Sequence, residues 1–272
     1  MSGQLRGPRR VRMPYVERLA EALSDRDWAI IQTVDRVRLI SGFQLERLHF
    51  HDLGTRSRSV MRWRVLKRLT DARVLYPLER RVGTARRGSA RLSYALDSAG
   101  QRLVRLRANC SSEEMRPRRP RIPGERFVAH TLAVSELYVA LVEQSRLGRF
   151  SVAGFEIEPG WHDGIGGWLR PDALVRLRGD SVTDYWWYEA DLATESLPTV
   201  RAKLLAYLDF VERGQAGPDG IVPRVLIGVP TEGRRAAVQG LVNGLPPPAE
   251  LMFVVALLPD APTVMVSELL QA

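Results

Sequence analysis

The residues best suited to chemistry are acids inside two apolar stretches in the second half of the chain. Asp172 follows W-L-R-P, and Glu189 and Asp191 close the run Y-W-W-Y-E-A-D. Burying a carboxylate is costly unless it is paired, hydrogen-bonded or bound to a metal. Hard oxygen ligands suit Mg²⁺, which polarises a phosphate and lowers the pKa of an attacking water. These acids therefore predict a divalent-metal site of nuclease type, with Mg²⁺ as the expected cofactor.

The structural alternative needs no metal. Asp172 would then accept a hydrogen bond from a backbone N–H or pair with Arg170. Glu189 and Asp191 would form an ion pair with Lys203 or Arg201 of the next helix; Lys203 is one of only two lysines in the chain. The residue types alone leave both alternatives open.

The elements of this half alternate between helical and β-strand patterns. A long, largely apolar helix comes first, and strands with carboxylates follow it. The predicted elements are a helix over 125–147, strands over 150–158, 169–177 and 184–191, a helix over 197–213, a strand over 224–229, a helix over 232–241 and a strand over 251–258.

Charge divides the chain into two halves. The net charge of the 272 residues is +9. Residues 1–126 contain 29 Lys and Arg against 13 Asp and Glu, a net charge of +16, whereas residues 127–272 contain 11 against 18, a net charge of −7. Such an asymmetry is expected when one half of a protein meets a polyanion.

Other features limit the class of protein. A single cysteine, Cys110, excludes an intramolecular disulfide framework and a cysteine-based zinc site. No run of about eighteen apolar residues could span a bilayer, and no export signal is visible. We therefore expect a cytoplasmic protein that does not enter a membrane.

The basic half predicts a module of three helices and a hairpin. Ser24 begins the first helix as an N-cap with Asp27 three residues on, the second helix spans 41–48, and Thr55 caps the third. Two β-prone runs around a glycine-bounded turn follow. The apolar residues of the third helix, expected to face inward with cations outward, are Val60, Trp63, Leu66 and Leu69.

This order predicts a winged helix-turn-helix that binds double-stranded DNA. The third helix of such a module enters the major groove, and the wing touches the backbone. The alternative is a solvated charged surface without a ligand. The candidates for reading bases are Thr55, Arg56, Ser57, Ser59 and Arg62, and the candidates for contacting the backbone are Arg86, Arg87 and Arg91.

The fold class expected from these patterns is α+β, in two domains. Residues 109–124 are rich in proline and arginine and have little to bury, so they predict a linker. The predicted organisation is a basic, irregular arm over 1–23, the winged helix-turn-helix over 24–108, the linker over 109–124 and an α/β domain with a mixed sheet over 125–272.

The second domain resembles the restriction-endonuclease-like fold. The segment R-P-D-A, followed seventeen residues later by E-A-D, is similar to the PD-(D/E)xK nuclease signature at Pro171, Asp172 and Glu189. The resemblance implies that Asp172 and Glu189 lie side by side on adjacent strands and hold Mg²⁺, joined by Glu136 from the preceding helix. Asp191 stands where the signature has lysine, as a further candidate ligand, and Lys203 could supply the missing cation.

The chain as a whole resembles the replication-relaxation proteins of plasmids and integrative elements. The match covers roughly residues 24–258 and rests on motifs such as S-G-F-Q-L-E-R-L-H-F, Y-A-L-D-S-A-G-Q-R-L and H-T-L-A-V-S-E-L-Y-V-A-L. It implies a role in the replication or relaxation of a mobile element. One expectation is an enzyme that nicks or cuts DNA; the other is a non-catalytic regulator or replication accessory. A homodimer is expected under both, with replication or conjugation proteins as further partners.

Overall fold

The computed structural model is α+β and divides into two compact units, Met1–Ser135 and Glu136–Ala272. The division falls inside the helix α6 (Glu125–Ser145), which carries residues of both units. No helix in the described ranges is both long and apolar enough to cross a membrane. The structure describes residues 11–78, 92–108, 124–162, 168–215 and 217–271.

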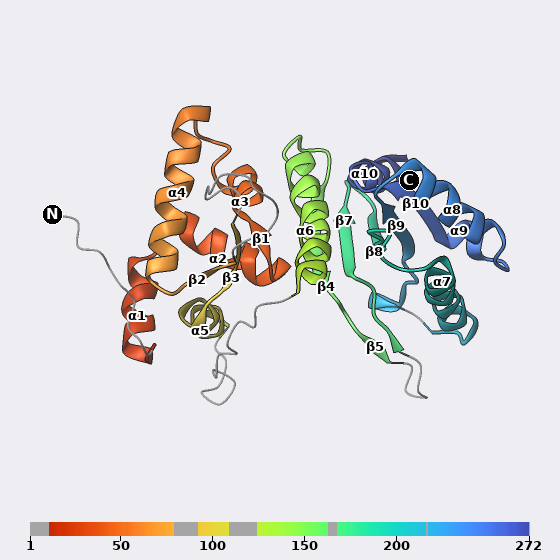
Figure 1. The fold of residues 1–272 in the computed structure, drawn as a ribbon, viewed down its shortest axis with the longest axis horizontal. Helices are drawn as coiled ribbons and strands as arrows, with labels where there is room; N and C mark the ends of the chain where they lie inside the picture. The colour runs from red at the N-terminus through yellow and green to blue at the C-terminus, as the bar shows by residue number, and fades with distance from the viewer. Residues whose placement is uncertain (1–10, 79–91, 109–123, 163–167, 216, 272) are drawn as a thin grey trace. The chain divides into compact units, whose positions relative to one another are not determined.

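The first unit combines helices with a small antiparallel sheet (Figure 1). The strand order in this sheet is β1-β3-β2. Its β2 and β3 pair antiparallel, as the predicted hairpin requires. The elements of this unit, before α6, are α1 (Met13–Ala22), α2 (Asp25–Val37), β1 (Ile40–Ser41), α3 (Gly42–His49), α4 (Thr55–Asp71), β2 (Leu75–Leu78), β3 (Ser93–Leu96) and α5 (Ser98–Arg107).

Hydrogen-bonding side chains set the starts of two helices. Ser24 caps α2 and forms a capping box with Asp27, which confirms the predicted start. Ser41 forms the same kind of box at α3. The prediction for α4 was wrong by one residue: Gly54 is the N-cap, with no side-chain cap bond, and Thr55 is the first helical residue.

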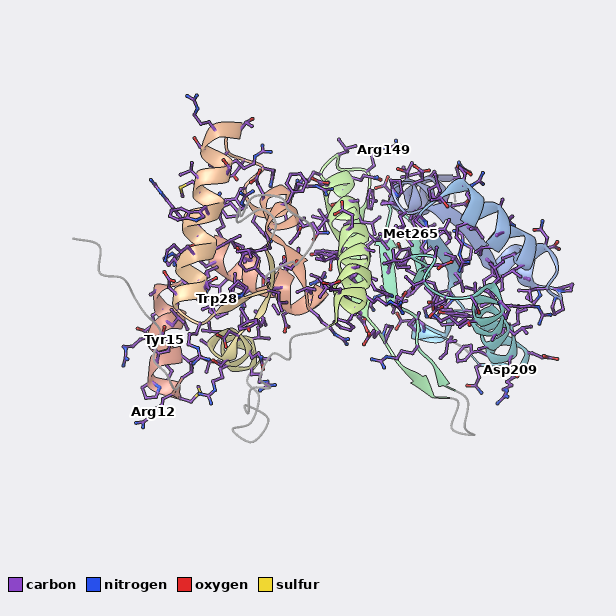
Figure 2. The ribbon with its side chains drawn as sticks, viewed as in Figure 1. Arg12, Tyr15, Trp28, Arg149, Asp209 and Met265 are labelled. Carbon is purple, nitrogen blue, oxygen red and sulfur yellow. The ribbon has the colours of Figure 1, made fainter. Side chains whose placement is uncertain are left out.

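Residues 13–22, expected to belong to an irregular arm, form the helix α1. Pro14 lies at its start, where the missing N–H costs nothing. Val16 is fully buried, and the Tyr15 hydroxyl donates a hydrogen bond to the carbonyl oxygen of Ala72 at 3.1 Å (Figure 2). The basic composition of the segment favours an irregular arm and does not predict these contacts.

The second unit is built on a mixed sheet of order β10-β9-β8-β7-β4. Its first three strands along the chain, β4, β7 and β8, pair antiparallel, and β8, β9 and β10 pair parallel. The elements are β4 (Ser151–Ile157), β5 (Trp161–His162), β6 (Trp168–Leu169), β7 (Ala173–Arg178), β8 (Thr183–Ala190), α7 (Leu197–Glu212), β9 (Arg224–Val229), α8 (Glu232–Asn243), α9 (Ala249–Met252), β10 (Phe253–Leu257) and α10 (Ala261–Gln271).

The central strand β8 is buried on both faces, and Trp186 and Trp187 are fully buried on opposite sides of it. Trp187 packs in a cluster with Leu204 of α7 and Val238 of α8. The helix α10, which was not predicted, contacts β7, β8 and β10, and its Met265 is fully buried (Figure 2). The face of β8 that carries Trp187 is therefore the face against which α7 packs.

Candidate functional site

The carboxylates of Asp172 and Glu189 lie on neighbouring strands of the second unit. Ala173, the first residue of β7, is paired with Tyr188 of β8, so Asp172 lies level with Glu189. The Asp172 Oδ2 atom accepts a hydrogen bond from the backbone N–H of Ala190, with 2.8 Å between nitrogen and oxygen. The antiparallel register thus brings together two acids that are seventeen residues apart in the chain.

Glu189 is deeply placed beneath α7. Glu189 is 9% exposed, and its Oε1 atom accepts a hydrogen bond from the hydroxyl of Tyr207. Burial raises the pKa of Glu189 from 4.5 to about 8, and the nearby Asp172 carboxylate adds to the rise. Lys203 and the Tyr207 hydroxyl lower this pKa and offset part of the rise. Glu189 therefore changes charge near neutral pH.

Lys203 supplies positive charge to this cluster from α7. Its Nζ atom lies 3.8 Å from Glu189 Oε2 and 3.0 Å from Glu195 Oε2. Burial alone would lower the pKa of Lys203, but the carboxylates of Glu189 and Glu195 raise it above the usual value. The side chain is thus an ammonium ion next to the predicted acids, although it lies fourteen residues beyond Glu189.

Asp191 does not share this cluster. Its Oδ2 atom accepts a hydrogen bond from Arg234 Nε of α8 at 2.7 Å, and its side chain is 7% exposed. The strand β8 ends at Ala190, so the alternation that placed Asp191 on the face of Glu189 does not extend to it. The expected ion pair with Lys203 or Arg201 is replaced by the pair with Arg234.

The predicted convergence of three acids on one ion is not found. Within the described ranges, no group of three or more Asp, Glu, His or Cys side chains is arranged to hold a metal ion. Glu136 is half-buried on α6. The groups that act on the pKa of Glu189 are Asp172, Lys203, Tyr207 and Glu195. The spacing that places Asp172 opposite Glu189 comes from a strand register, and Glu136 comes from a different element, α6.

Three residues of this site were not foreseen as functional. The sequence motifs assign no chemical role to Tyr207, Glu195 or Arg234. The signal for Tyr207 was its position four residues after Lys203, which places both on one face of α7. Arg234 could not be found this way, because it comes from a different element and meets Asp191 only in the folded chain.

In the first unit, α4 begins with exposed polar residues. Thr55, Arg56, Ser57 and Ser59 are all exposed, as a base-reading helix would require. Arg62 is not available in this way: it is 7% exposed and forms an ion pair with Glu46 of α3. Its helical position faces the interior, so we withdraw it as a candidate for reading bases.

The inner face of α4 differs from the predicted one. Leu66 and Leu69 are buried, but Val60 is 45% exposed and Trp63 is 50% exposed. Val65, rather than Trp63, shares the buried side. The predicted backbone contacts at Arg86, Arg87 and Arg91 lie outside the described residues.

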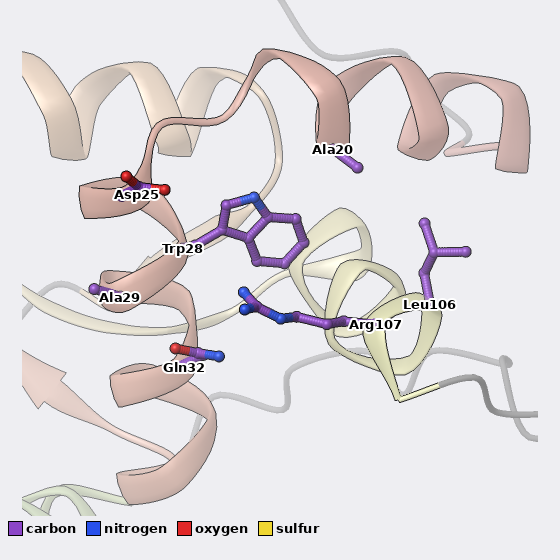
Figure 3. A pocket seen from close by; sticks show the side chains of 7 residues that line it. All are labelled: Ala20, Asp25, Trp28, Ala29, Gln32, Leu106 and Arg107. Carbon is purple, nitrogen blue, oxygen red and sulfur yellow. The ribbon is translucent and has the colours of Figure 1, made fainter.

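A pocket in the first unit is lined by none of the predicted site residues (Figure 3). It is formed by α1, α2 and α5, and the guanidinium carbon of Arg107 lies 5.1 Å from the ring centre of Trp28. Trp28 is half-buried there. The residues lining the pocket are Ala20, Asp25, Trp28, Ala29, Gln32, Leu106 and Arg107.

Comparison with known proteins identifies one family. No curated protein and no solved structure matches the chain. The sequence model described as replication-relaxation matches residues 31–225, more than two thirds of the 272 residues. The matched range includes α4 and the cluster of Asp172, Glu189 and Lys203. The chain therefore belongs to the replication-relaxation family.

Proposed function

We propose that this protein binds double-stranded DNA through its first unit and acts in the replication or relaxation of a mobile element. The observation that carries the proposal is the exposed start of α4, where Thr55, Arg56 and Ser57 face solvent beside further cations. The family description supports the biological setting. The charge of the first half, +16 over residues 1–126, supports a polyanionic partner.

The order of elements supports a winged helix-turn-helix. The series α2, β1, α3, α4, β2, β3 ends in an antiparallel pair, and β1 joins that pair at the edge of β3. In this arrangement α4 is the helix that would enter the major groove, with its first turns reaching base edges. Arg56 and Arg64 are both exposed on α4, and neither has an ion-pair partner among the described residues.

The test is duplex binding by the double variant Arg56→Ala/Arg64→Ala. Removing the two guanidinium groups is expected to weaken binding, and each one that contacts a phosphate contributes about 0.9 to the slope of log affinity against log salt. Arg149→Ala is the matched control, because Arg149 is an exposed arginine of the second unit (Figure 2). Unchanged affinity and slope in the double variant would show that α4 is not the DNA-binding surface.

A second candidate function is metal-dependent nicking or cutting of DNA by the second unit. The observation that favours it is the cluster of Asp172, Glu189 and Lys203. Mg²⁺ is commonly held by one or two carboxylates together with substrate phosphates, so two acids are enough to begin such a site. The like charges of Asp172 and Glu189, which raise the pKa of Glu189, are those that a divalent cation would relieve.

The residues would divide the chemistry among them. Asp172 and Glu189 would hold the Mg²⁺ ion, which when bound supplies Lewis acidity to the phosphate. The Lys203 ammonium would stabilise negative charge on the phosphate oxygens, in place of the lysine that Asp191 replaces. Tyr207 would keep the Glu189 carboxylate oriented through its hydrogen bond.

The non-catalytic alternative treats the same contacts as structural. Lys203 then neutralises Glu189 and Glu195, and the second unit serves for dimerisation or for docking replication or conjugation proteins. Incubation of supercoiled plasmid with the protein and Mg²⁺ or Mn²⁺ separates the two. Conversion to open-circle or linear DNA that is lost in Asp172→Asn, but kept in the exposed-acid control Asp209→Asn, supports the enzyme. Absence of conversion across all DNAs tested would favour the non-catalytic alternative.

A further inference from the structure

The exposed face of α4 carries two apolar side chains among its cations. Val60 is 45% exposed and Trp63 is 50% exposed. They are three positions apart, so they are neighbours on one face of the helix. Arg56 lies four positions before Val60, and Lys67 lies four positions after Trp63, so cations lie at both ends of this apolar pair. We call Val60 and Trp63 the apolar pair of α4.

This pair contributes little to the core that α4 covers. The buried face of the helix consists of Val65, Leu66 and Leu69, together with Arg62. A half-exposed tryptophan beside a half-exposed valine is costly to leave in water, which indicates a surface that meets a ligand. The surrounding positive charge favours an anionic ligand.

We propose that Val60 and Trp63 contact the C5-methyl groups of thymines in the major groove and so determine part of the DNA sequence preference. This inference rests on the proposed function, in which α4 enters that groove. Each A·T pair presents one thymine methyl there, and apolar side chains are the groups that contact it. Arg64, on the same exposed side of α4, would meet the phosphates that border the groove, while Arg56 in the first turn would reach base edges.

A protein partner fits this surface less well. Docking a protein on the apolar pair would also bury Arg56 and Arg64, and removing such charges from water is costly without matching acids. Lys67 already has an acidic partner, Asp71, at 2.6 Å. DNA instead offers phosphates to the cations and methyl groups to the apolar pair at the same time. Charge complementarity thus selects duplex DNA as the occupant.

The test replaces thymine by uracil, which removes only the methyl group. Duplexes that the full chain binds tightly are first selected from a random pool, and each thymine of the selected site is then exchanged singly. The wild-type protein is expected to bind about fourfold more weakly for each contacted methyl that is lost. At the thymine that Trp63 contacts, the Trp63→Ala variant is expected to bind the thymine and the uracil duplex equally, while keeping the wild-type salt slope. Leu251→Ala, at a residue 76% exposed in the second unit, is the control and should keep the thymine preference.

The outcomes separate this inference from the proposed function. Equal binding of thymine and uracil duplexes by the wild-type protein overturns the inference and leaves DNA binding intact. A thymine preference that persists unchanged in Trp63→Ala also overturns it, and a dimer that dissociates in that variant would assign the apolar pair to a protein interface. Failure to bind any duplex overturns the proposed function and the inference with it. The comparison of thymine and uracil duplexes uses wild-type protein, so it tests the inference even where the Trp63→Ala variant fails to fold.

Discussion

A carboxyl group is neutral when protonated and negatively charged when ionised. The pKa of Glu189 lies close to neutral pH, so a small change in its surroundings decides which form is present. Burial and the Asp172 carboxylate raise its pKa, while Lys203 and Tyr207 lower it. The balance of these effects on the Glu189 pKa decides whether Asp172 and Glu189 together carry one negative charge or two. A cation, either an ammonium or a metal ion, would shift that balance towards the ionised form.

The raised pKa of Glu189 predicts a specific pH dependence of stability. A group whose pKa is higher in the folded state stabilises the fold fully below its unfolded pKa and loses that contribution as pH rises through the folded value. Without divalent metal, the free energy of unfolding should therefore fall between about pH 4.5 and pH 8, by on the order of 4–5 kcal/mol from this residue. Urea unfolding at several pH values checks this. Glu189→Gln should flatten the fall in that window, and an unchanged profile in the variant would contradict the assignment.

Tyr207→Phe should extend the upper end of the same window to higher pH. The Tyr207 hydroxyl donates to Glu189 and favours the ionised carboxylate, so removing it raises the Glu189 pKa further. A hydrogen bond to a charged group contributes about 1.5–3 kcal/mol, which corresponds to a shift of about one pH unit or more. Tyr185→Phe is the control, since that hydroxyl makes an exposed hydrogen bond to Asp219. A shift of equal size in both variants would disprove a local effect.

At the scale of elements, helices and strand ends decide which side chains meet. The helix α7 presents Lys203 and Tyr207 to β8, because residues four apart lie on one helical face. The end of β8 at Ala190 releases Asp191 towards α8. Arg234 of α8 binds Asp191 and also donates to the carbonyl oxygen of Glu195 at 2.8 Å. The segment between β8 and α7 is thereby attached to α8.

Arg234→Ala should destabilise the second unit strongly. Its side chain is 13% exposed and that of Asp191 is 7% exposed, so the variant leaves a buried carboxylate without its partner. Such losses cost about 3–5 kcal/mol. Arg235→Ala is a close control, because Arg235 forms an exposed pair with Glu232 that is worth less than about 1 kcal/mol. Thermal unfolding of the two variants compares them directly, and similar losses would contradict the buried role of Arg234.

The orientation of α4 predicts that substitutions on its two faces change the free energy of unfolding by unequal amounts. Leu66 is fully buried, so Leu66→Ala should lower the free energy of unfolding by about 2–5 kcal/mol. Val60→Ala, at a half-exposed position, should change it by less than about 0.5 kcal/mol. Chemical denaturation measures both. A larger loss for Val60→Ala than for Leu66→Ala would mean that the opposite face of α4 is the packed one.

At the scale of the whole molecule, charge distinguishes the two halves of the chain. The balance is +16 over residues 1–126 and −7 over residues 127–272. The structure divides the chain at a nearby position, between Ser135 and Glu136. A basic unit followed by an acidic one fits a protein that meets DNA mainly through one of its two units.

The affinity of the full chain for duplex DNA should depend steeply on salt. Each neutralised phosphate contributes about −0.9 to the slope of log affinity against log salt, because bound counterions are released. Contacts with six to ten phosphates would weaken binding by about 10³–10⁵ between about 50 and 200 mM salt. A titration in that range with a fixed duplex measures the slope. A slope near zero would contradict electrostatic binding by the basic half.

Several elements followed from the sequence because their signals are local. The capping box of Ser24 and Asp27 and the strand Arg224–Val229 lie where they were predicted. The inner face of α4 was misassigned for a geometric reason. Apolar residues every three positions drift by about 60° per step on a helix of 3.6 residues per turn, so Val60 and Leu69 end on opposite sides.

The sequence by itself determined the α+β class and the charge asymmetry, since helical and strand patterns and charge counts are read from short segments. The adjacency of Asp172 and Glu189, expected only from the resemblance to the nuclease signature, comes from the antiparallel register of β7 and β8. Only the tertiary structure decided the partners of those acids. Tyr207 and Lys203 reach Glu189 because α7 packs over one face of the sheet, and Arg234 takes Asp191 because α8 lies beside the end of β8. Ion pairs and hydrogen bonds between distant elements depend on where those elements pack, and no local sequence pattern predicts that packing.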